Sequence, residues 1–281
     1  MISPIENYLI KDELTLKRYR RFKRNKAAVL SVWTFAAMLF FSFTAELWFN
    51  STPHVLKYHG TVYFPLVKDY HPSLFGQNDV QVMDYRSLEL GPEDWAVWPL
   101  VQWDPFESNK FVDTYPAGPS RHNLMGTDDR GRDVFARLVY GFRYTIIYAV
   151  GVWFLTFLIG CAVGAAMGYM GGKVDLIGMR LIEVFESIPS FFILITIISI
   201  FTPNMTLLII FSVVFNWTYS SHYMRGQFLS LRKREYVEAT RSLGSSHTRI
   251  ILKHILPNSL TPILTLSPFV IAENIYSLTI M

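Results

Sequence analysis

Charged residues and cysteine are both scarce in this sequence. Asp, Glu, Lys and Arg make up 17% of its 281 residues, against about 25% in an ordinary soluble protein. The single cysteine, Cys161, cannot form an internal disulfide, which excludes a disulfide-stapled fold. Apolar residues make up 51% of the chain, and this composition excludes a disordered, collagen-like or coiled-coil protein.

Motifs that carry catalysis are also absent. The sequence has no G-x-x-x-x-G-K-[ST], H-E-x-x-H, C-x-x-C or G-x-S-x-G pattern. Its seven histidines show no spacing typical of metal ligands, so no metal or other cofactor is expected. We therefore predict that the chain is not an enzyme and does not itself hydrolyse nucleotide by the P-loop route.

Long apolar runs are what the sequence does contain. A helix needs about 20 mostly apolar residues to cross a bilayer. Five runs reach this length once the break at residues 202–204 is taken to divide the longest of them. They predict transmembrane helices at 27–49, 144–170, 179–201, 205–224 and 259–281. The predicted fold class is an all-α polytopic membrane protein with five visible spans.

Basic residues predict the orientation of these spans. Residues 1–26 hold eight Lys or Arg and three Asp or Glu, and residues 225–254 hold seven and two. Residues 50–141 hold eight Lys or Arg and twelve Asp or Glu. Because positive charge marks cytoplasmic loops, we predict a cytoplasmic N-terminus, a cytoplasmic turn at 171–175 and an extracytoplasmic insertion at 50–141. Basic clusters between spans of this length do not indicate a nucleic-acid partner.

The first apolar run has one alternative interpretation, a cleaved signal peptide. The apolar region of a signal peptide usually has about 7–15 residues. Residues 27–49 form a longer run, which favours an uncleaved anchor.

The predicted insertion at 50–141 shows no strong periodicity and is expected to be rich in loops, packed on the membrane face. Trp95, Trp98 and Trp103 lie close together in it. These side chains could anchor the insertion at the membrane interface or contact a substrate, and both interpretations stay open.

The predicted cytoplasmic segment 232–257 shows the pattern of two short helices. The first carries side chains that recur at helical spacing, namely Tyr236, Val237, Thr240 and Leu243. Gly244 can end it, and Ser245 or Ser246 can cap a second helix with Ile250, Ile251 and Ile255 on one face. Pro257 is expected to break this second helix just before the last span.

This segment resembles the EAA loop of ABC importer permeases, in which E-A-A, a glycine and I-x-L-P follow one another at fixed spacing. Thr240 replaces the second Ala, and His254 stands where Ile is usual. The resemblance implies that the first helix docks in a cleft of a separate ATPase subunit. An ordinary amphipathic surface helix is the alternative. The residues assigned to ATPase coupling are Glu235, Glu238, Ala239, Gly244, Leu256 and Pro257.

Residues 122–143 resemble the G-T-D-x-x-G-R-D signature that precedes the second span of dipeptide and oligopeptide permeases. We expect a turn followed by a short amphipathic helix lying in the outer interface. Its role is either a scaffold that leads the chain into the span, or gating and substrate contact. The motif residues are Gly126, Thr127, Asp128, Gly131, Arg132 and Asp133.

Residues 168–189 are similar to a further stretch of the same family. Glu183 and Glu186 lie near the predicted cytoplasmic interface, where a structural role is favoured over a functional one, and Pro189 is expected to kink the third span. Small residues every four positions predict close approach of another helix to the second span. They are Gly160, Gly164 and Gly168.

Taken together, residues 17–281 resemble peptide-importing ABC permeases, and residues 58–70 of the insertion are similar to the Yej-type subgroup associated with oligopeptide and microcin C uptake. The resemblance implies an inner-membrane permease subunit with four kinds of partner: a second homologous permease, ATPase subunits, an extracytoplasmic peptide-binding protein and membrane lipid. The family has six spans, so we expect this chain to be truncated at its C-terminus. The alternatives are a permease of the same class for another solute, such as nickel, and a secondary transporter or channel.

Overall fold

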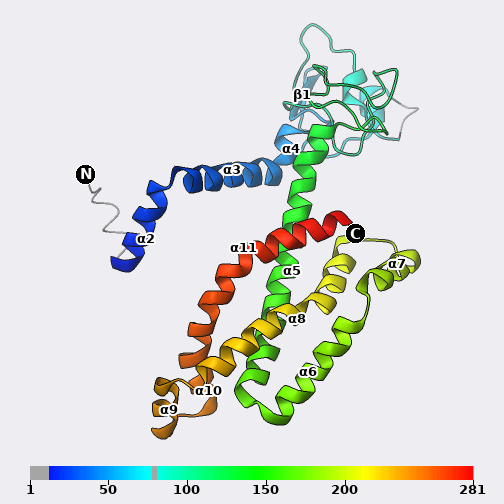
Figure 1. Ribbon diagram of the computed structural model, residues 1–281. Coiled ribbons are helices and arrows are strands. Elements are labelled where there is room, and N and C mark those ends of the chain that lie inside the picture. Colours follow the sequence, from blue (N-terminus) through cyan, green and yellow to red (C-terminus); the bar gives the residue numbers. More distant parts are fainter. Residues whose placement is uncertain (1–12, 78–80, 281) are drawn as a thin grey trace. The chain divides into compact units, whose positions relative to one another are not determined.

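Helices account for most of the chain in the computed structural model, which describes residues 13–77 and 81–280 (Figure 1). Residues 1–12 of the predicted cytoplasmic N-terminus and Met281 of the predicted last span lie outside the described residues. The chain divides into one unit of residues 1–144 and a second of residues 145–281.

The first unit begins with helices that carry the basic and the first apolar segment. α2 (Glu13–Arg24) is rich in Lys and Arg, and α3 (Lys26–Phe43) follows after Asn25, whose side chain accepts a hydrogen bond from the Ala28 N–H at 3.2 Å. Only 6% of α3 is buried. An apolar helix with so little protein around it is suited to contact with lipid.

The predicted insertion is largely irregular, but it contains a small antiparallel sheet that the sequence did not reveal. α4 (Ala45–Trp48) leads into it, and the strands are β1 (Val55–Tyr58), β2 (Thr61–Tyr63) and β3 (Trp95–Val97), in the order β2-β1-β3. Two 3-10 helices, η1 (Pro72–Phe75) and η2 (Tyr85–Ser87), cover one core of this unit. A second core contains Ala45, Phe49, Val101, Trp103, Ala136, Val139 and Tyr140.

The second unit is built from long helices (Figure 1). α5 (Val134–Met170) enters it from the first unit and is followed by α6 (Gly172–Ser187), α7 (Ser190–Ile200) and α8 (Met205–Leu231). Two short helices, α9 (Glu235–Ser242) and α10 (His247–Arg249), precede a π-helical turn, η3 (Ile250–Ile255), and α11 (Leu256–Ile280).

Fewer helices qualify as membrane spans than the five predicted. Within the described ranges, three are long and apolar enough, namely α3, α5 and the continuous helix over His247–Ile280. The pair α6 and α7, bent by 65°, is a fourth candidate. α8 covers the fourth predicted span but is not among them. It carries polar side chains, and several of these are buried inside the protein: Ser212, Thr218, Ser220 and Ser221.

Local structure differs from the prediction at three further places. The third predicted span is two separate helices, because Pro189 and Ile188 adopt extended backbone between α6 and α7. The turn expected at 171–175 is only Gly171, since α6 already starts at Gly172. The short interfacial helix expected after Asp133 is not separate: no proline divides it from the apolar run, and α5 continues through Gly141.

Candidate functional site

The segment 232–257 forms a compact turn between two helices. α9 ends where Gly244 adopts a left-handed φ of +76°. The N–H of Gly244 donates to the Arg241 carbonyl at 3.0 Å, and the N–H of Ser245 donates to the Thr240 carbonyl at 3.3 Å. This is the Schellman arrangement, which satisfies the last carbonyls of a helix and favours glycine at the left-handed position.

The second helix of the segment begins at a serine cap but does not end at Pro257. Ser246 accepts the Arg249 N–H at 3.4 Å, which makes it the cap. The expected break at Pro257 is wrong, because η3 runs directly into α11. A π turn is wider than an α turn, and the N–H of Leu256 bonds back to the Ile251 carbonyl, so the proline ring is accommodated at the first turn of α11.

One face of the segment is anchored in the second unit. Val237, Ile250 and Ile255 are each 0% exposed and pack with Met224 and Phe228 of α8. The end of α5 is tied to the same segment, because the Tyr169 hydroxyl lies 2.7 Å from Nδ1 of His247. The segment is therefore fixed to the helices around it.

Most of the rest of α9 and the residue that follows it are exposed. Tyr236 is 40% exposed and Leu243 is 86% exposed, so only part of the predicted apolar face packs inward. Of the residues assigned to ATPase coupling, Leu256 is half-buried at the start of α11, and the others are exposed: Glu235, Glu238, Ala239, Gly244 and Pro257.

The glycines of the predicted packing motif lie against α8. A Cβ atom at Gly160 would lie 2.4 Å from the Ser220 Cβ, and one at Gly168 would lie 2.6 Å from the Phe228 Cβ. Ser221 donates to the Gly160 carbonyl at 3.2 Å across the same contact. α5 and α8 thus approach to a distance that only glycine permits.

One ion pair and one histidine–carboxylate contact link α6 to α8, and sequence reasoning found neither. Arg225 donates two hydrogen bonds to the Asp175 carboxylate, at 2.5 and 2.8 Å. Glu186 lies 3.0 Å from Nε2 of His222. Each pair joins residues at least 36 positions apart, which helical periodicity alone cannot bring together. Glu183 pairs with Arg180 within α6.

The glycine- and aspartate-rich motif forms a closed hydrogen-bonded turn in the first unit. The Thr127 hydroxyl accepts the Ala117 N–H at 2.9 Å, and Asp133 accepts the Ala136 N–H at 2.7 Å at the start of α5. Gly126 and Gly131 both have φ above +70°, and a Cβ atom at either would lie 2.4 Å from neighbouring atoms. These contacts hold the turn together and cap α5. A role in gating or substrate contact stays a prediction.

Two buried asparagines support this turn, although nothing in the sequence set them apart. Asn109 donates to the Asn123 side chain at 2.5 Å, and Asn123 donates to Asp133 at 2.8 Å. Both asparagines are 1% exposed. Asparagine is common in surface turns, so its presence there gives no signal of burial.

Asp128 gives the turn a dependence on pH. Partial burial raises the pKa of this carboxyl, but hydrogen bonds from the side chain and backbone of Arg132 and from the Arg130 N–H outweigh it and lower the pKa from 3.8 to about 2. Because the folded pKa lies below the unfolded value, the stabilisation is complete well above pH 3.8 and is lost as pH falls toward 2.

We therefore expect Asp128→Asn to reduce the free energy of unfolding by about 2 kcal/mol at pH 7, and by progressively less below pH 3.8. Unfolding of the purified chain in detergent, followed at pH 7 and at pH 2.5, measures this difference. The exposed neighbour Asp129 provides the control, and Asp129→Asn should leave stability unchanged. An Asp128→Asn defect of the same size at pH 2.5 and pH 7 would contradict this account.

Comparisons with known proteins agree with these features. Residues 158–281 match the family described as the binding-protein-dependent transport system inner membrane component. Residues 17–72 match the N-terminal TM domain of oligopeptide transport permease C.

Individual relatives match over most of the chain. The inner membrane ABC transporter permease protein YejE of Escherichia coli is 36% identical over 270 residues, covering 93% of this chain and 78% of that protein. The peptidoglycan transport system permease protein YejE of Agrobacterium fabrum is 32% identical over 294 residues, covering 94% of this chain and 77% of that protein. The oligopeptide transport system permease protein OppC of Bacillus subtilis is 33% identical over 159 residues, covering 57% of this chain and 52% of that protein. The chain therefore belongs to the family of inner membrane permease components of binding-protein-dependent transport systems.

Proposed function

We propose that this chain is a permease subunit of an ATP-driven importer of peptides in a bacterial inner membrane, with its N-terminus in the cytoplasm. ATP is hydrolysed on a separate ATPase subunit that docks on the segment 232–257. A second permease subunit completes the translocation path, and an extracytoplasmic binding protein delivers the peptide. ATP-driven closure of the ATPases moves the segment and switches the spans from inward- to outward-facing.

The observation that carries this proposal is that α9 is buried on one side and exposed to solvent elsewhere. Its inner face, at Val237, is fully buried, while Tyr236 on the helix and Leu243, the residue that directly follows it, are exposed. An exposed apolar side chain on an otherwise polar helix is suited to contact with another protein. Because the inner face is packed against α8, a partner bound outside acts directly on the membrane helices.

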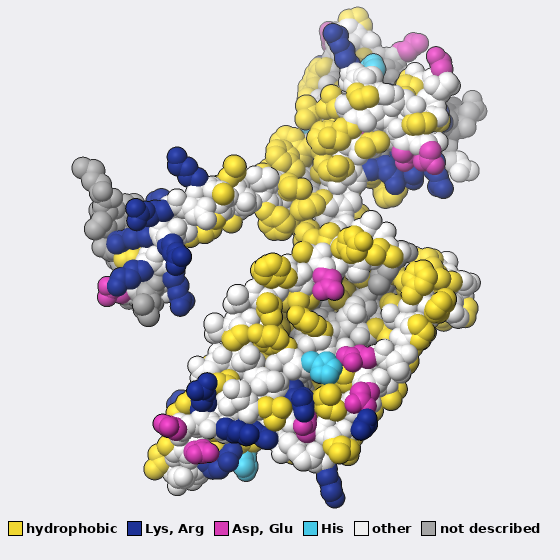
Figure 2. Space-filling model, in the orientation of Figure 1, with side chains coloured by type: hydrophobic (Ala, Val, Ile, Leu, Met, Phe, Trp, Pro, Cys, Tyr) yellow, Lys and Arg dark blue, Asp and Glu magenta, His cyan; other side chains and the backbone are white. Residues whose placement is uncertain are grey.

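The arrangement of the second unit supports the proposed topology. The turn after α5 and the segment 232–257 are both predicted to be cytoplasmic, and the Tyr169–His247 contact places them at one end of this unit. On the face shown in Figure 2, the Lys and Arg side chains of the unit gather toward this end, whereas hydrophobic side chains cover the helices between the ends. This distribution agrees with positive charge on the cytoplasmic side.

The relatives favour peptides as the substrate class. The names of several refer to dipeptide, oligopeptide or peptidoglycan transport. A permease for nickel and a secondary transporter or channel are not favoured by these matches.

Replacing the exposed leucine tests ATPase docking directly. We expect Leu243→Asp to weaken binding of the cognate ATPase at least about tenfold, because it puts a charge into an apolar contact. Co-purification and titration of the ATPase onto the permease complex in nanodiscs measure this.

Val67 provides a matched control, since it is also 86% exposed but lies in the insertion. Val67→Asp should leave ATPase binding unchanged. The proposal fails if the ATPase does not bind the unmodified complex, or if Leu243→Asp and Val67→Asp bind it equally well.

A further inference from the structure

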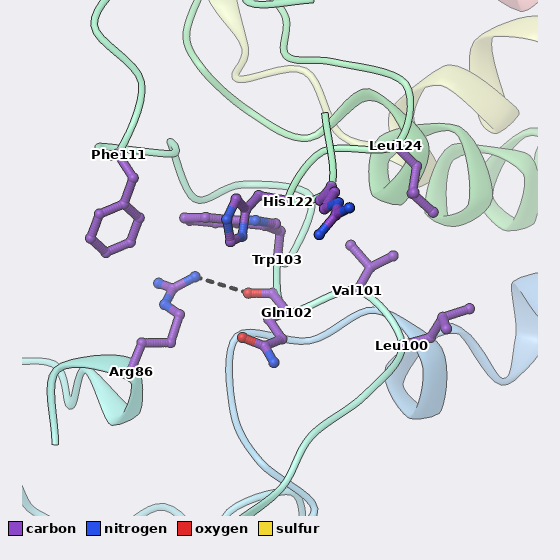
Figure 3. Close-up of a pocket in the computed structure, with 9 residues that line it drawn as sticks. Arg86, Leu100, Val101, Gln102, Trp103, Phe111, His122 and Leu124 are labelled. Carbon is purple, nitrogen blue, oxygen red and sulfur yellow. Dashed lines mark hydrogen bonds between the residues drawn. The ribbon is translucent and has the colours of Figure 1, made fainter. Parts of the chain in front are cut away.

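A cavity of about 560 Å³ opens in the first unit, within the predicted extracytoplasmic insertion (Figure 3). This volume falls in the range of about 300–1,000 Å³ that is usual for small-ligand sites. It involves none of the residues assigned to ATPase coupling and none of the six residues of the G-T-D-x-x-G-R-D motif.

The floor of the cavity is aromatic and electrically balanced. Trp103 is only 4% exposed, and the Arg86 guanidinium stacks over its ring at 4.1 Å from the centroid. Arg86 also donates to the Gln102 carbonyl at 2.9 Å and pairs with Glu107. Arg86 therefore already has a carboxylate partner, and it stacks on the indole.

The walls of the cavity are apolar side chains that are exposed to solvent. Phe111 is 74% exposed, and its ring centroid lies 6.2 Å from that of Trp103. Figure 3 shows Phe111, Trp103 and Arg86 on one side of the cavity, with the aliphatic Leu100 and Leu124 on the other. Leu100 is 74% exposed and Leu124 is 51% exposed. An apolar side chain bound in the cavity would remove apolar surface of these walls from water.

The rim of the cavity carries the positive charge of Arg121 and the imidazole of His122. Arg121 and His122 line the cavity and are exposed, and within the described ranges no carboxylate pairs with either side chain. With Arg86 balanced by Glu107, the cavity has an excess of positive charge. A ligand with a carboxylate next to an apolar side chain matches both features.

We propose that this cavity binds the carboxyl-terminal residue of a peptide, with its apolar side chain between Phe111 and the leucines and its carboxylate at Arg121 and His122. The inference rests on the proposed function, which supplies the peptide class and the extracytoplasmic position. It makes the insertion a holding site for peptide outside the membrane helices.

Peptide binding to the full-length chain in nanodiscs, without ATPase, binding protein or nucleotide, tests this. The probe is Ala-Ala-Phe with a fluorophore on its N-terminus, followed by fluorescence anisotropy. The free acid should bind at least tenfold more tightly than the carboxamide. Phe111→Ala and Arg121→Ser should each weaken the free acid at least tenfold.

Matched controls lie in the same unit. Phe106 is 75% exposed but does not line the cavity, and Arg130 is also exposed outside it. Phe106→Ala and Arg130→Ser should bind the free acid like the unmodified chain.

Three results would overturn the inference: no binding of the free acid, equal binding of acid and amide, or binding that survives both Phe111→Ala and Arg121→Ser. Loss of binding-protein docking in Phe111→Ala, without any peptide bound, would assign the cavity to a protein partner instead. Docking of the ATPase on Leu243 is measured separately, so this inference can fail while the proposed function stands.

Discussion

Gly164→Ala is expected to lower the free energy of unfolding by about 3 kcal/mol or more, at the upper end of what overpacking costs. A Cβ atom at this position would lie 2.3 Å from the carbonyl oxygen of Ser221 and 3.0 Å from the N of Arg225. Both atoms belong to the backbone of α8, so no side chain can rotate away. α5 and α8 must separate, and the contacts between them are lost.

The single cysteine reports on this separation. Cys161 is 8% exposed and lies in the cluster between α5 and α8, beside the glycine contact. We expect its thiol to react with a maleimide on the order of a hundredfold faster in Gly164→Ala than in the unmodified chain, since labelling follows opening of the contact.

Gly226 is the matched control, because a Cβ atom there would meet no atom within 4 Å. Gly226→Ala lies inside α8 and should stabilise the protein by up to about 1 kcal/mol through helix propensity. Similar labelling rates for Gly164→Ala and Gly226→Ala would show that the close approach of α5 and α8 does not contribute to stability.

Gly244→Val is expected to reduce ATP-driven transport on the order of a hundredfold while the chain stays folded. Gly244 has φ +76° and no atom within 4 Å of an added Cβ, so the change introduces backbone strain and no steric contact. A β-branched residue at such a φ costs about 3 kcal/mol, which corresponds to that factor in the population of the native turn. Transport measured in proteoliposomes with the whole complex, together with ATPase binding, tests this.

Gly76 provides a control with the same backbone geometry. Its φ is +78°, nothing lies within 4 Å of an added Cβ, and it belongs to the insertion in the first unit, whereas the segment 232–257 belongs to the second. Gly76→Val should therefore cost similar local stability but leave ATPase binding unchanged. If both variants impair ATPase binding equally, or neither does, the turn at Gly244 has no specific part in coupling.

Helical periodicity, together with the glycine, serine and proline residues that end or cap helices, predicted much of the helical structure. The left-handed Gly244 and the cap at Ser246 follow from local backbone preferences, which sequence displays directly, and the kink expected at Pro189 is instead a complete break between α6 and α7. Pro257 was misjudged because the same residue is tolerated in the first turn of a helix, and the π turn before it cannot be seen in a pattern of residue types.

Features that depend on contacts between residues far apart in the sequence could not be predicted. The three strands have only three or four residues each and show no alternation, so their pairing is set by register across the insertion. α8 is less apolar than a typical span because its polar residues are buried against other helices. The cavity at Trp103 is assembled from residues 86–124, which no motif connects.

The attachment of the segment 232–257 has a mechanical consequence. The chain joins it to α8 at one end and to α11 at the other, and the Tyr169–His247 contact joins it to α5. A body held at three separate points cannot swing about a single hinge. We therefore expect a force applied at α9 to reach three helices at once, so that the segment would displace them together and would not turn a single one.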